Sequence, residues 1–547
     1  MKTFRDVVLE RANDPNPAIL FDDLVISYAD FVQAASDRAA LFAELRVEGP
    51  PHIGVLLDNV PEFPMWICAS ALAGATLVGI NPTRRGAELA RDIRHTDCQL
   101  IVTESNYLPL LDGLDLGIPA ERILTIDSAA FAAGLARHVG SPVPDVEVAP
   151  GDRLLLLFTS GTSGAPKAVI CTQSKLAMTG HGLIAIAGIH SKSVAYQVMP
   201  MFHSNALFAG YAPTVVAGAA SALRRKFSAS GFLPDVRRYK ATYFNYVGKP
   251  LSYILTTPEQ PDDAENTLEY VFGNEGADLD LERFSKRFNV PVKDGYGSTE
   301  GGTSISRTDD MPKGALGVAD PAVKVFDSET EKECPPAEFD PHGRLTNPVE
   351  AIGEIVNTAG SGMFEGYYKN DEANDARMRN GWYWTGDLGY RDTAGFFYFA
   401  GRDFEWLRVD GENFSAAPVE RILARSPEVV LAAVYAVPDS EVGDQVMAAL
   451  QLLDPASFDP AAFDRFLSEQ SDLGTKWSPR YVRVTDALPI SRTSKVQKRQ
   501  LRAERWECGE TVYYRPAKGD RLRLMGSEDV ETVRAEFESR DRLSQLA

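Results

Sequence analysis

The sequence predicts an α/β protein with two domains. Helical patterns alternate with short apolar strands, as at 53–57 and 100–102, and this alternation continues to about residue 310. From about Gly314 the pattern changes to short strands separated by Gly and Pro, which indicates a small β unit. A chain of 547 residues is also too long for one core. We therefore expect a large N-terminal domain, 1–402, of layered α/β sheets plus the β unit, and a small α+β C-terminal domain, 403–547.

Individual elements follow from local patterns. The apolar run at 154–158 predicts a buried strand. Two charge-free stretches, 63–80 and 204–223, contain Gly and Pro breakers, which favour a buried helix running into a buried strand over a membrane span. Further expected elements are strands at 316–318, 323–325, 353–356, 396–399, 429–436 and 445–453, a helix near 417–425, and a charged amphipathic tail at 521–540.

Composition narrows the class of protein and its surroundings. The net charge is −20 and the pI is near 4.9, so the surface repels nucleic acid and anionic lipid unless a local basic patch intervenes. The 5 cysteines are scattered, with neither metal-ligand spacing nor a paired framework, and we expect no signal peptide because residues 1–6 lead into mixed charge and not into an apolar run. We expect a cytoplasmic protein that binds no nucleic acid; peripheral membrane contact and a homodimer stay open.

A loop of small residues, 159–167, follows the apolar run directly. Its glycines leave backbone N–H groups uncovered, and its hydroxyls and terminal lysine add donors and a positive charge, as in a phosphate-binding loop. The spacing does not fit Gly-x-x-x-x-Gly-Lys-Ser/Thr, and a flexible surface turn is the alternative. The candidate phosphate-binding residues are Thr159, Ser160, Gly161, Thr162, Ser163, Gly164 and Lys167.

A second glycine-rich motif, 294–302, reads Asp-Gly-Tyr-Gly-Ser-Thr-Glu-Gly-Gly. The glycines on either side of Tyr296 allow its ring to lie flat on a base. Thr299 can bind a phosphate oxygen, and Glu300 offers the hard oxygen ligand that Mg²⁺ prefers. Gly297 and Ser298 complete this candidate nucleotide site. A glycine-rich turn with a solvated glutamate is the alternative.

Asp387 lies in a third motif, Gly-Trp-Tyr-Trp-Thr-Gly-Asp-Leu-Gly at 381–389. An ionised aspartate after Thr-Gly can accept both ribose hydroxyls. A turn-forming aspartate is the alternative, which the surrounding residues disfavour.

These stretches together resemble the adenylate-forming superfamily, which includes acyl-CoA synthetases, luciferases and peptide-synthetase adenylation domains. The loop 159–167 is similar to its signature loop, and 294–302 to its motif that stacks on adenine, binds the α-phosphate and holds Mg²⁺. Gly273, Asn274 and Glu275 resemble its other adenine-side loop, and Asp387 and Arg402 resemble the pair that reaches the ribose. The branch most similar is that of very-long-chain acyl-CoA synthetases and fatty-acid transport proteins, through 81–86, 296–301, 408–413 and 512–515.

The resemblance also assigns roles in the C-terminal domain, which it implies rotates between half-reactions. Gly411 would leave space for the pantetheine chain of CoA, and Lys495 would contact the substrate carboxylate and the α-phosphate. Ser494 replaces the family's usual glycine before this lysine, so Lys498 is a rival. Phe404 departs from the Asp or Lys usual at the family's hinge.

The resemblance implies an ATP-dependent acyl-CoA ligase that uses ATP, Mg²⁺ and CoA and forms an acyl-AMP intermediate. The stretch 199–208 contains no acidic residue to meet a substrate amine, so we expect a hydrophobic acid such as a long-chain fatty acid or a steroid side-chain acid. His203, Asn205 and Phe208 are the candidate acid-binding residues, although Met, Phe and Leu are more often plain core residues and a core histidine is the alternative for His203. Alternatives are an acyl-AMP ligase that serves a carrier protein, and a lipid-uptake or lipid-binding protein.

Overall fold

The chain forms two compact units in a computed structural model, one mainly of residues 1–401 and one mainly of residues 402–547. The structure describes residues 2–159, 167–248, 250–255, 257–274, 276, 278–308, 310–312, 314–328, 330–339, 346–402, 406–410, 412–441, 443–452, 454–471, 473–489, 496 and 498–546. Each unit has its own hydrophobic core. The α/β fold class expected from the sequence is confirmed.

One sheet of the larger unit has the strand order β6-β5-β3-β4-β7-β8. Its strands are β6 (Ile123–Thr125), β5 (Cys98–Thr103), β3 (His52–Leu56), β4 (Thr76–Gly79), β7 (Arg153–Thr159) and β8 (Lys167–Thr172). The strands from β6 to β7 run parallel, and the four leucines of β7 are buried. A parallel strand covered on both faces favours such a continuous apolar run.

The second sheet has the order β13-β12-β11-β9-β10-β1-β2, parallel apart from the β1–β2 hairpin. Its strands are β13 (Val292–Asp294), β12 (Tyr270–Asn274), β11 (Tyr243–Val247), β9 (Val194–Gln197), β10 (Ala220–Leu223), β1 (Pro17–Phe21) and β2 (Leu24–Ser27). Because β9, β11, β12 and β13 are parallel neighbours, their carboxyl ends meet at one edge. The chain segments that follow these strands are therefore brought together.

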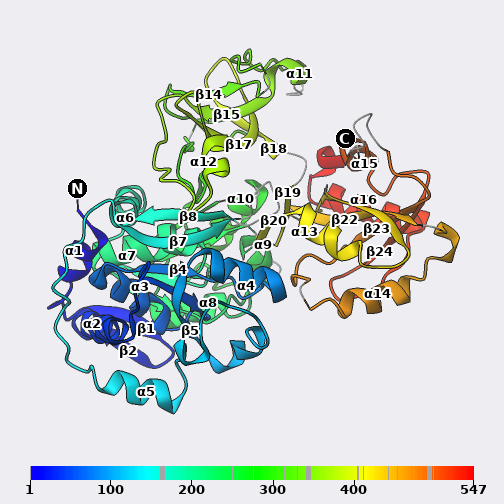
Figure 1. Cartoon of the computed structure of the whole chain (residues 1–547). Helices are drawn as coiled ribbons and strands as arrows, with labels where there is room; N and C mark the ends of the chain where they lie inside the picture. The colour runs from blue at the N-terminus through cyan, green and yellow to red at the C-terminus, as the bar shows by residue number, and fades with distance from the viewer. Residues whose placement is uncertain are drawn as a thin grey trace. The chain divides into compact units, whose positions relative to one another are not determined.

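Helices cover the two sheets. α2 (Tyr28–Leu45) packs beside α3 (Glu62–Ala73), and α6 (Gln173–Ala187) lies beside α7 (Ala212–Ala217), as Figure 1 shows. A π-helix, η3 (Ala206–Tyr211), leads directly into α7. The remaining helices of this part are α1 (Phe4–Leu9), α4 (Gly86–His95), η1 (Ser105–Leu110), η2 (Ala120–Arg122), α5 (Ala129–Ala136), α8 (Phe232–Tyr239), α9 (Pro250–Leu255) and α10 (Asp278–Phe288).

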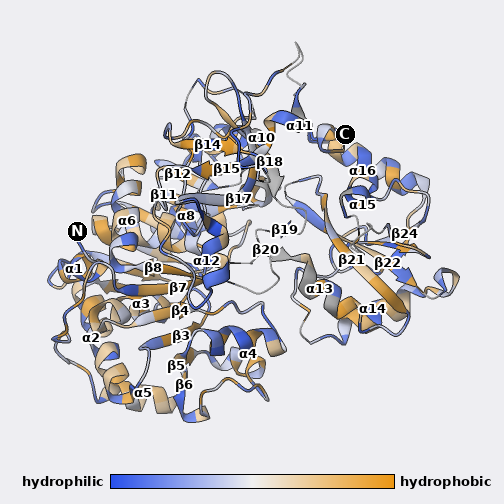
Figure 2. Cartoon of the chain, turned by 45° about the horizontal axis from the view of Figure 1, so that its top comes forward, coloured by the Kyte–Doolittle hydropathy of each residue, from blue (hydrophilic) through white to orange (hydrophobic). Residues whose placement is uncertain are grey.

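The two charge-free stretches form a helix followed by a strand, as predicted. Residues 63–80 fold as α3 and β4, and 204–223 as η3, α7 and β10. In Figure 2 the ribbon of α3 is largely hydrophobic, whereas α4 carries many hydrophilic residues. Across the residues that the structure describes, no helix has both the length and the apolar character needed to cross a membrane.

An antiparallel β unit follows, with the order β14-β15-β17-β16 and with β18 paired to β17. Its elements are β14 (Val323–Phe326), α11 (Pro348–Ala351), β15 (Gly353–Asn357), α12 (Asp371–Arg377), β16 (Met378–Arg379), β17 (Trp382–Arg391) and β18 (Phe397–Arg402). The strand expected at 316–318 is reduced to isolated bridges to Ser306 and Phe397. Gly317 explains this, because its φ of +126° breaks the extended backbone and a Cβ there would lie 2.0 Å from the Ser306 carbonyl oxygen.

The smaller unit contains a hairpin, β19 (Trp406–Val409) and β20 (Glu412–Ser415), and a mixed sheet ordered β21-β22-β23-β24-β25. The sheet strands are β21 (Val429–Pro438), β22 (Asp444–Leu452), β23 (Tyr481–Thr485), β24 (Thr511–Tyr514) and β25 (Arg523–Leu524). The helices are α13 (Ala416–Leu423), η4 (Pro455–Ser457), α14 (Pro460–Ser468), α15 (Lys498–Glu504), α16 (Ser527–Ser539) and η5 (Leu543–Leu546). The predicted amphipathic tail thus contains α16.

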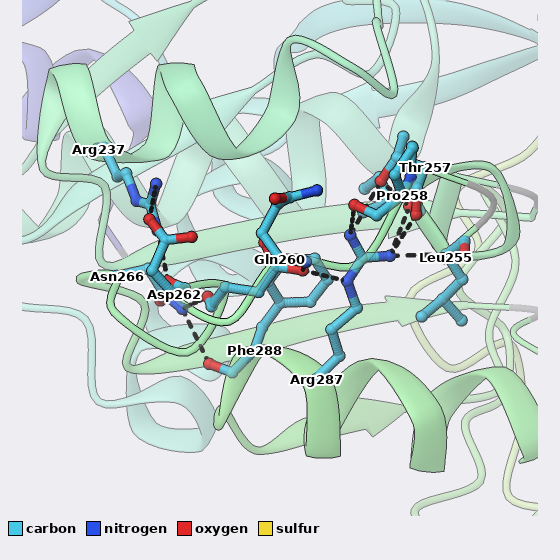
Figure 3. A network of polar contacts seen from close by, with 11 residues as sticks. Arg237, Leu255, Thr257, Pro258, Gln260, Asp262, Asn266, Arg287 and Phe288 are labelled. Atoms are coloured by element: carbon cyan, nitrogen blue, oxygen red, sulfur yellow. Dashed lines mark hydrogen bonds and ion pairs between the residues drawn. The ribbon is translucent and has the colours of Figure 1, made fainter.

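One arginine holds the irregular segment between α9 and β12. Arg287, on α10, donates from Nε to Asp263 Oδ2 at 2.6 Å, and both partners are almost fully buried. Its other nitrogens donate to the carbonyl oxygens of residues 254, 255, 257 and 258. Asn266 adds bonds from Nδ2 to the carbonyl oxygens of Asp263 and Phe288, both at 2.9 Å. Figure 3 shows this network, which supplies the backbone partners that a helix or strand would otherwise supply.

Candidate active site

Several of the predicted site residues lie at the ends of strands. Thr159 ends β7, Lys167 begins β8, and Asn274 ends β12. The motif 294–302 starts at the last residue of β13. Arg402 ends β18, and its side chain is not among those described. The candidates Ser160, Gly161, Thr162, Ser163, Gly164, Glu275, Gly411 and Lys495, and the hinge residue Phe404, lie outside the described residues.

Tyr296 and Asp387, from motifs far apart in the sequence, are joined in the structure. The Tyr296 hydroxyl donates to Asp387 Oδ2 at 2.6 Å, and Asp387 is only 4% exposed. The turn that carries Asp387 is held by Thr385, which accepts from the Asp387 N–H at 3.0 Å and donates to the Ile355 carbonyl at 2.7 Å. The two motifs are therefore in contact, and their roles in nucleotide binding, including ring stacking of Tyr296 on a base, stay predictions.

Gly273 has a packing role beside this site. A Cβ at Gly273 would lie 2.3 Å from the ring of Tyr246, so only glycine fits there. The Tyr246 hydroxyl in turn donates to Asp294 Oδ2 at 2.7 Å, and the Gly276 N–H donates to the same oxygen at 2.7 Å. Asp294 thus links Gly276, which lies just after β12, to the start of the 294–302 motif.

Glu300 is the centre of a buried charged cluster. Its Oε1 accepts from the Tyr367 hydroxyl at 2.8 Å, and the same hydroxyl accepts from Arg377 Nε at 3.1 Å. The Lys167 ammonium lies 5.2 Å from the centre of the Tyr367 ring. We call these four residues, Glu300, Tyr367, Arg377 and Lys167, the Glu300 cluster. Its side chains come from β8, from α12 and from two loops.

The electrostatics of the Glu300 cluster suit an anionic ligand. Desolvation and the nearby Arg377 lower the pKa of Lys167, while Glu300 raises it. Desolvation opposes the charge of Arg377, but Tyr367, Tyr383 and Glu300 outweigh it and raise the Arg377 pKa. Two cations thus lie around one carboxylate in a water-poor setting, where a phosphate charge would interact strongly with them.

The donor set around Glu300 fits Mg²⁺ bound together with phosphates. Mg²⁺ is usually held by one or two carboxylates plus waters and substrate phosphates. Glu300 supplies one such carboxylate and is 8% exposed. Over the described ranges, no group of three or more His, Cys, Asp or Glu side chains could hold a metal by itself. Metal binding by Glu300 stays a prediction.

Three asparagine amides connect the acid-binding stretch to the nucleotide side. Asn245 Nδ2 donates to Asn205 Oδ1 at 2.9 Å, Asn205 Nδ2 donates to Asn274 Oδ1 at 3.1 Å, and Asn274 Nδ2 donates to the Gly295 carbonyl at 2.6 Å. We call this the asparagine chain. It crosses the carboxyl edge of β11, β12 and β13. Beside it, Ser204 and Thr299 share a hydrogen bond of 2.7 Å between their hydroxyls.

Backbone carbonyls fix the direction of the asparagine chain. Asn274 must present its NH₂ to the Gly295 carbonyl, and Asn205 must present its NH₂ to the Tyr246 carbonyl at 3.0 Å. The Asn205 oxygen therefore faces Asn245, which must donate. This leaves Asn245 Oδ1 buried without a hydrogen-bond partner among the described residues, 2.8 Å from where a Cβ on Gly210 would stand. Gly210, in the π-helix η3, thus leaves room for the Asn245 amide.

The other acid-binding candidates divide between the site and the core. His203 and Phe208 are half-buried, and Lys175 Nζ lies 6.0 Å from the centre of the Phe208 ring. Met199 and Met201 are buried in hydrophobic clusters, and Asn59 holds both by their backbones. For these two methionines the core interpretation is the one observed.

Several residues of this site were not predicted from the sequence. They are Tyr246, Asp294, Tyr367, Arg377, Asn245 and Lys175. Asp294 is the first residue of the 294–302 motif, so its position in the sequence could have indicated that it belongs to the site. The others stand in segments without motif spacing, and only their burial and contacts reveal them.

Known families and proteins match nearly the whole chain. The pattern of the AMP-binding enzyme family matches residues 8–368, and that of the AMP-binding enzyme C-terminal domain matches 418–495. Steroid-22-oyl-CoA synthetase of Rhodococcus jostii (strain RHA1) is 50% identical over 93% of this chain and 92% of its own. The medium/long-chain-fatty-acid–CoA ligase FadD17 of Mycobacterium marinum (strain ATCC BAA-535 / M) is 49% identical, covering 90% of this chain and 95% of its own. A solved structure of a double mutant of o-succinylbenzoate CoA synthetase from Bacillus subtilis matches with a TM-score of 0.73 and 24% identity, over 90% of this chain and 97% of that one.

Proposed function

Because this chain belongs to the AMP-binding enzyme family, we propose that it is an ATP-dependent acyl-CoA ligase for a hydrophobic carboxylic acid. The observation that supports the proposal is the hydrogen bond between Tyr296 and Asp387, which brings the motifs 294–302 and 381–389 into contact. The relatives of about half identity, named a steroid-22-oyl-CoA synthetase and a medium/long-chain-fatty-acid–CoA ligase, support the choice of acid.

The reaction has two steps. A carboxylate oxygen attacks the α-phosphorus of ATP, forming an O–P bond as the bond to pyrophosphate breaks. The CoA thiolate then attacks the acyl carbon, and the C–S bond forms as the acyl C–O bond breaks and AMP leaves. A carboxylate alone is a poor acyl donor, and AMP provides the leaving group. We assign the mobile part of this cycle to residues 403–547, with Lys495 acting in the first step.

The residues of the larger unit would act mainly by position and charge. Lys167 and Arg377 would stabilise phosphate charge, and Mg²⁺ bound by Glu300 would neutralise more of it. Asp387 would accept the ribose hydroxyls in place of the Tyr296 hydroxyl or together with it. Thr299, already bonded to Ser204, lies where the nucleotide motif meets the acid-binding stretch.

The acid is proposed to be hydrophobic because the stretch 199–208 offers no charge to a polar substrate. ATP–pyrophosphate exchange with a panel of acids tests the first step whatever the acceptor. Thioester formation with free CoA separates a CoA ligase from an acyl-AMP ligase that serves a carrier protein. Absence of exchange with every acid would favour a lipid-uptake or lipid-binding role.

Activity is expected to rise with the length of the acid. Each additional buried CH₂ contributes up to about 0.8 kcal/mol, which is roughly a fourfold gain in kcat/KM per carbon until the binding site is full. We would measure kcat/KM for CoA thioester formation across acids of two to eighteen carbons and one steroid side-chain acid. A maximum at two to four carbons, with no turnover of the long or polycyclic acids, would contradict a hydrophobic acid and leave the ligase assignment intact.

Replacing Asn245 with alanine is expected to weaken binding of the acid more than binding of ATP. The change removes the donor to Asn205 and leaves a buried acceptor unpaired, which costs about 1–3 kcal/mol. The KM for the acid should rise by about tenfold, with a smaller change in the KM for ATP.

The matched control is Ser221→Ala. Ser221 is a buried polar residue of the same sheet, and its hydroxyl accepts a hydrogen bond of 3.0 Å from Gln197 Nε2. The control should lower the melting temperature without changing either KM. Equal effects of the two substitutions on both KM values would mean that the asparagine chain is only structural.

A further inference from the structure

Lys175 is a buried lysine that lies outside every recognised motif. It stands in the first turn of α6 and is 3% exposed. The cap residue Thr172 accepts from the Lys175 N–H at 3.2 Å. Thr172 is itself held by Glu365, to which it donates from its N–H at 2.8 Å and from its hydroxyl at 2.5 Å. The start of α6, and with it Lys175, is thereby fixed.

A lysine at this position is unfavourable by local criteria. Burial of a charge costs several kcal/mol unless the charge is paired. A cation in the first turn also opposes the helix dipole, whose positive end lies there. In the described part of the chain, no carboxylate forms an ion pair with the Lys175 ammonium. Some other interaction must therefore offset the cost of burying the charge of Lys175.

The Lys175 ammonium forms hydrogen bonds with two successive carbonyl groups of the 294–302 motif. Lys175 Nζ donates to the Glu300 carbonyl at 2.8 Å and to the Thr299 carbonyl at 3.3 Å. In an extended strand successive carbonyls point to opposite sides, so one ammonium could not bind both. Here the chain turns, and Gly301 follows with a φ of +72°. The positive charge makes both bonds stronger than neutral ones would be.

The turn held by Lys175 carries the two side chains that matter most for phosphate chemistry. Thr299 projects to Ser204, at 2.7 Å between hydroxyls, and Glu300 projects to Tyr367, at 2.8 Å. A rotation of either peptide plane would move one or both side chains. The same ammonium lies over the ring of Phe208, in the acid-binding stretch.

We propose that Lys175 is a positioning residue for adenylation, and that its charge fixes the Thr299–Glu300 backbone so that Glu300 meets the metal and Thr299 meets the phosphate. This inference rests on the proposed function. Lys175 touches neither reactant in this scheme, and its effect passes through the two carbonyl groups.

The test compares Lys175→Met, which keeps the length but loses the charge, with Lys175→Arg, which keeps the charge. ATP binding is measured by calorimetry against Mg²⁺ concentration without acid, and kcat and KM are measured separately in ATP–pyrophosphate exchange. The Met variant should need about 10–100-fold more Mg²⁺ for ATP binding and lose a similar factor in kcat, the range seen when a supporting residue of a metal ligand is removed. The KM for the acid should change little, and Arg should restore most of the loss.

The matched control is Leu183→Ala, a core change on the same helix that does not touch residues 299 and 300. It should lower the melting temperature while leaving the Mg²⁺ dependence unchanged. If Lys175→Met does not fold, Lys175→Gln, which loses the charge but keeps an N–H donor, replaces it. A Mg²⁺ dependence equal to that of the control would overturn the role of Lys175 alone, whereas failure of the wild-type protein to bind ATP would overturn the proposed function as well.

Discussion

Replacing Lys495 with alanine is expected to abolish adenylation and to spare thioester formation from supplied acyl-AMP. The basis is the match of 488–496 to the family motif that ends in a lysine. Loss of one charge contact that forms at the reacting phosphate lowers rates on the order of 10²–10³-fold. ATP–pyrophosphate exchange measures the first step, and CoA consumption with chemically prepared acyl-AMP measures the second.

Lys498→Ala is the matched comparison because Lys498 is the rival for this role. Its ammonium lies 2.9 Å from Glu420 Oε1, and the same oxygen accepts from the Val434 N–H at 2.7 Å. Lys498 therefore joins α15 to α13 and β21, so its loss should reduce stability while exchange stays near normal. The reverse pattern, with exchange lost in Lys498→Ala and kept in Lys495→Ala, would move the catalytic role to Lys498.

Glu300→Gln is expected to raise the Mg²⁺ requirement steeply and to reduce activity on the order of 10²–10³-fold. The amide oxygen can still accept from Tyr367, so the local geometry survives. The charge does not survive, and a neutral amide is a weaker ligand for a hard cation. The measurement is a Mg²⁺ titration of both ATP binding and pyrophosphate exchange.

Tyr367→Phe separates charge from orientation at the same site. It removes the donor to Glu300 and the acceptor for Arg377 but keeps the Glu300 charge. The expected loss is about tenfold, at the lower end of the range for groups that support a metal ligand. If Glu300→Gln required the same Mg²⁺ concentration as the wild type, that result would argue against metal binding by Glu300. This would hold even if the Tyr367→Phe variant were less active.

Local patterns predicted much of the fold. The apolar run at 154–158 forms β7, and the charge-free stretch 63–80 forms α3 and β4. Both could be predicted because the pattern that specifies each element lies in residues close in sequence. The strand predicted at 316–318 is not formed, because Gly317 has a φ of +126° and packs closely against the Ser306 carbonyl of another segment of the chain. Contacts of that kind are set by tertiary structure and leave no local signal.

The candidate site divides in the same way. Tyr296, Glu300 and Asp387 lie in sequence motifs whose residue types indicate nucleotide or metal binding, so the sequence alone identifies them as candidate site residues. Arg377 could not be nominated, because a basic residue in the last turn of the acidic helix α12 is typical of a solvated surface helix. Only the fold shows that its guanidinium donates to the Tyr367 hydroxyl and lies beside Gly386. The roles given to Gly411 and Lys495, outside the described residues, stay predictions.

The anchoring of the segment between α9 and β12 by Arg287 has a consequence for how that region loses order. Helices and strands can fray one bond at a time, because each backbone group has its own partner. Here four carbonyl groups and the Asp263 carboxylate share one guanidinium. Breaking a buried pair of this kind by removing one partner costs about 3–5 kcal/mol. The segment should therefore be either ordered throughout or disordered throughout, with no partly released state between the two.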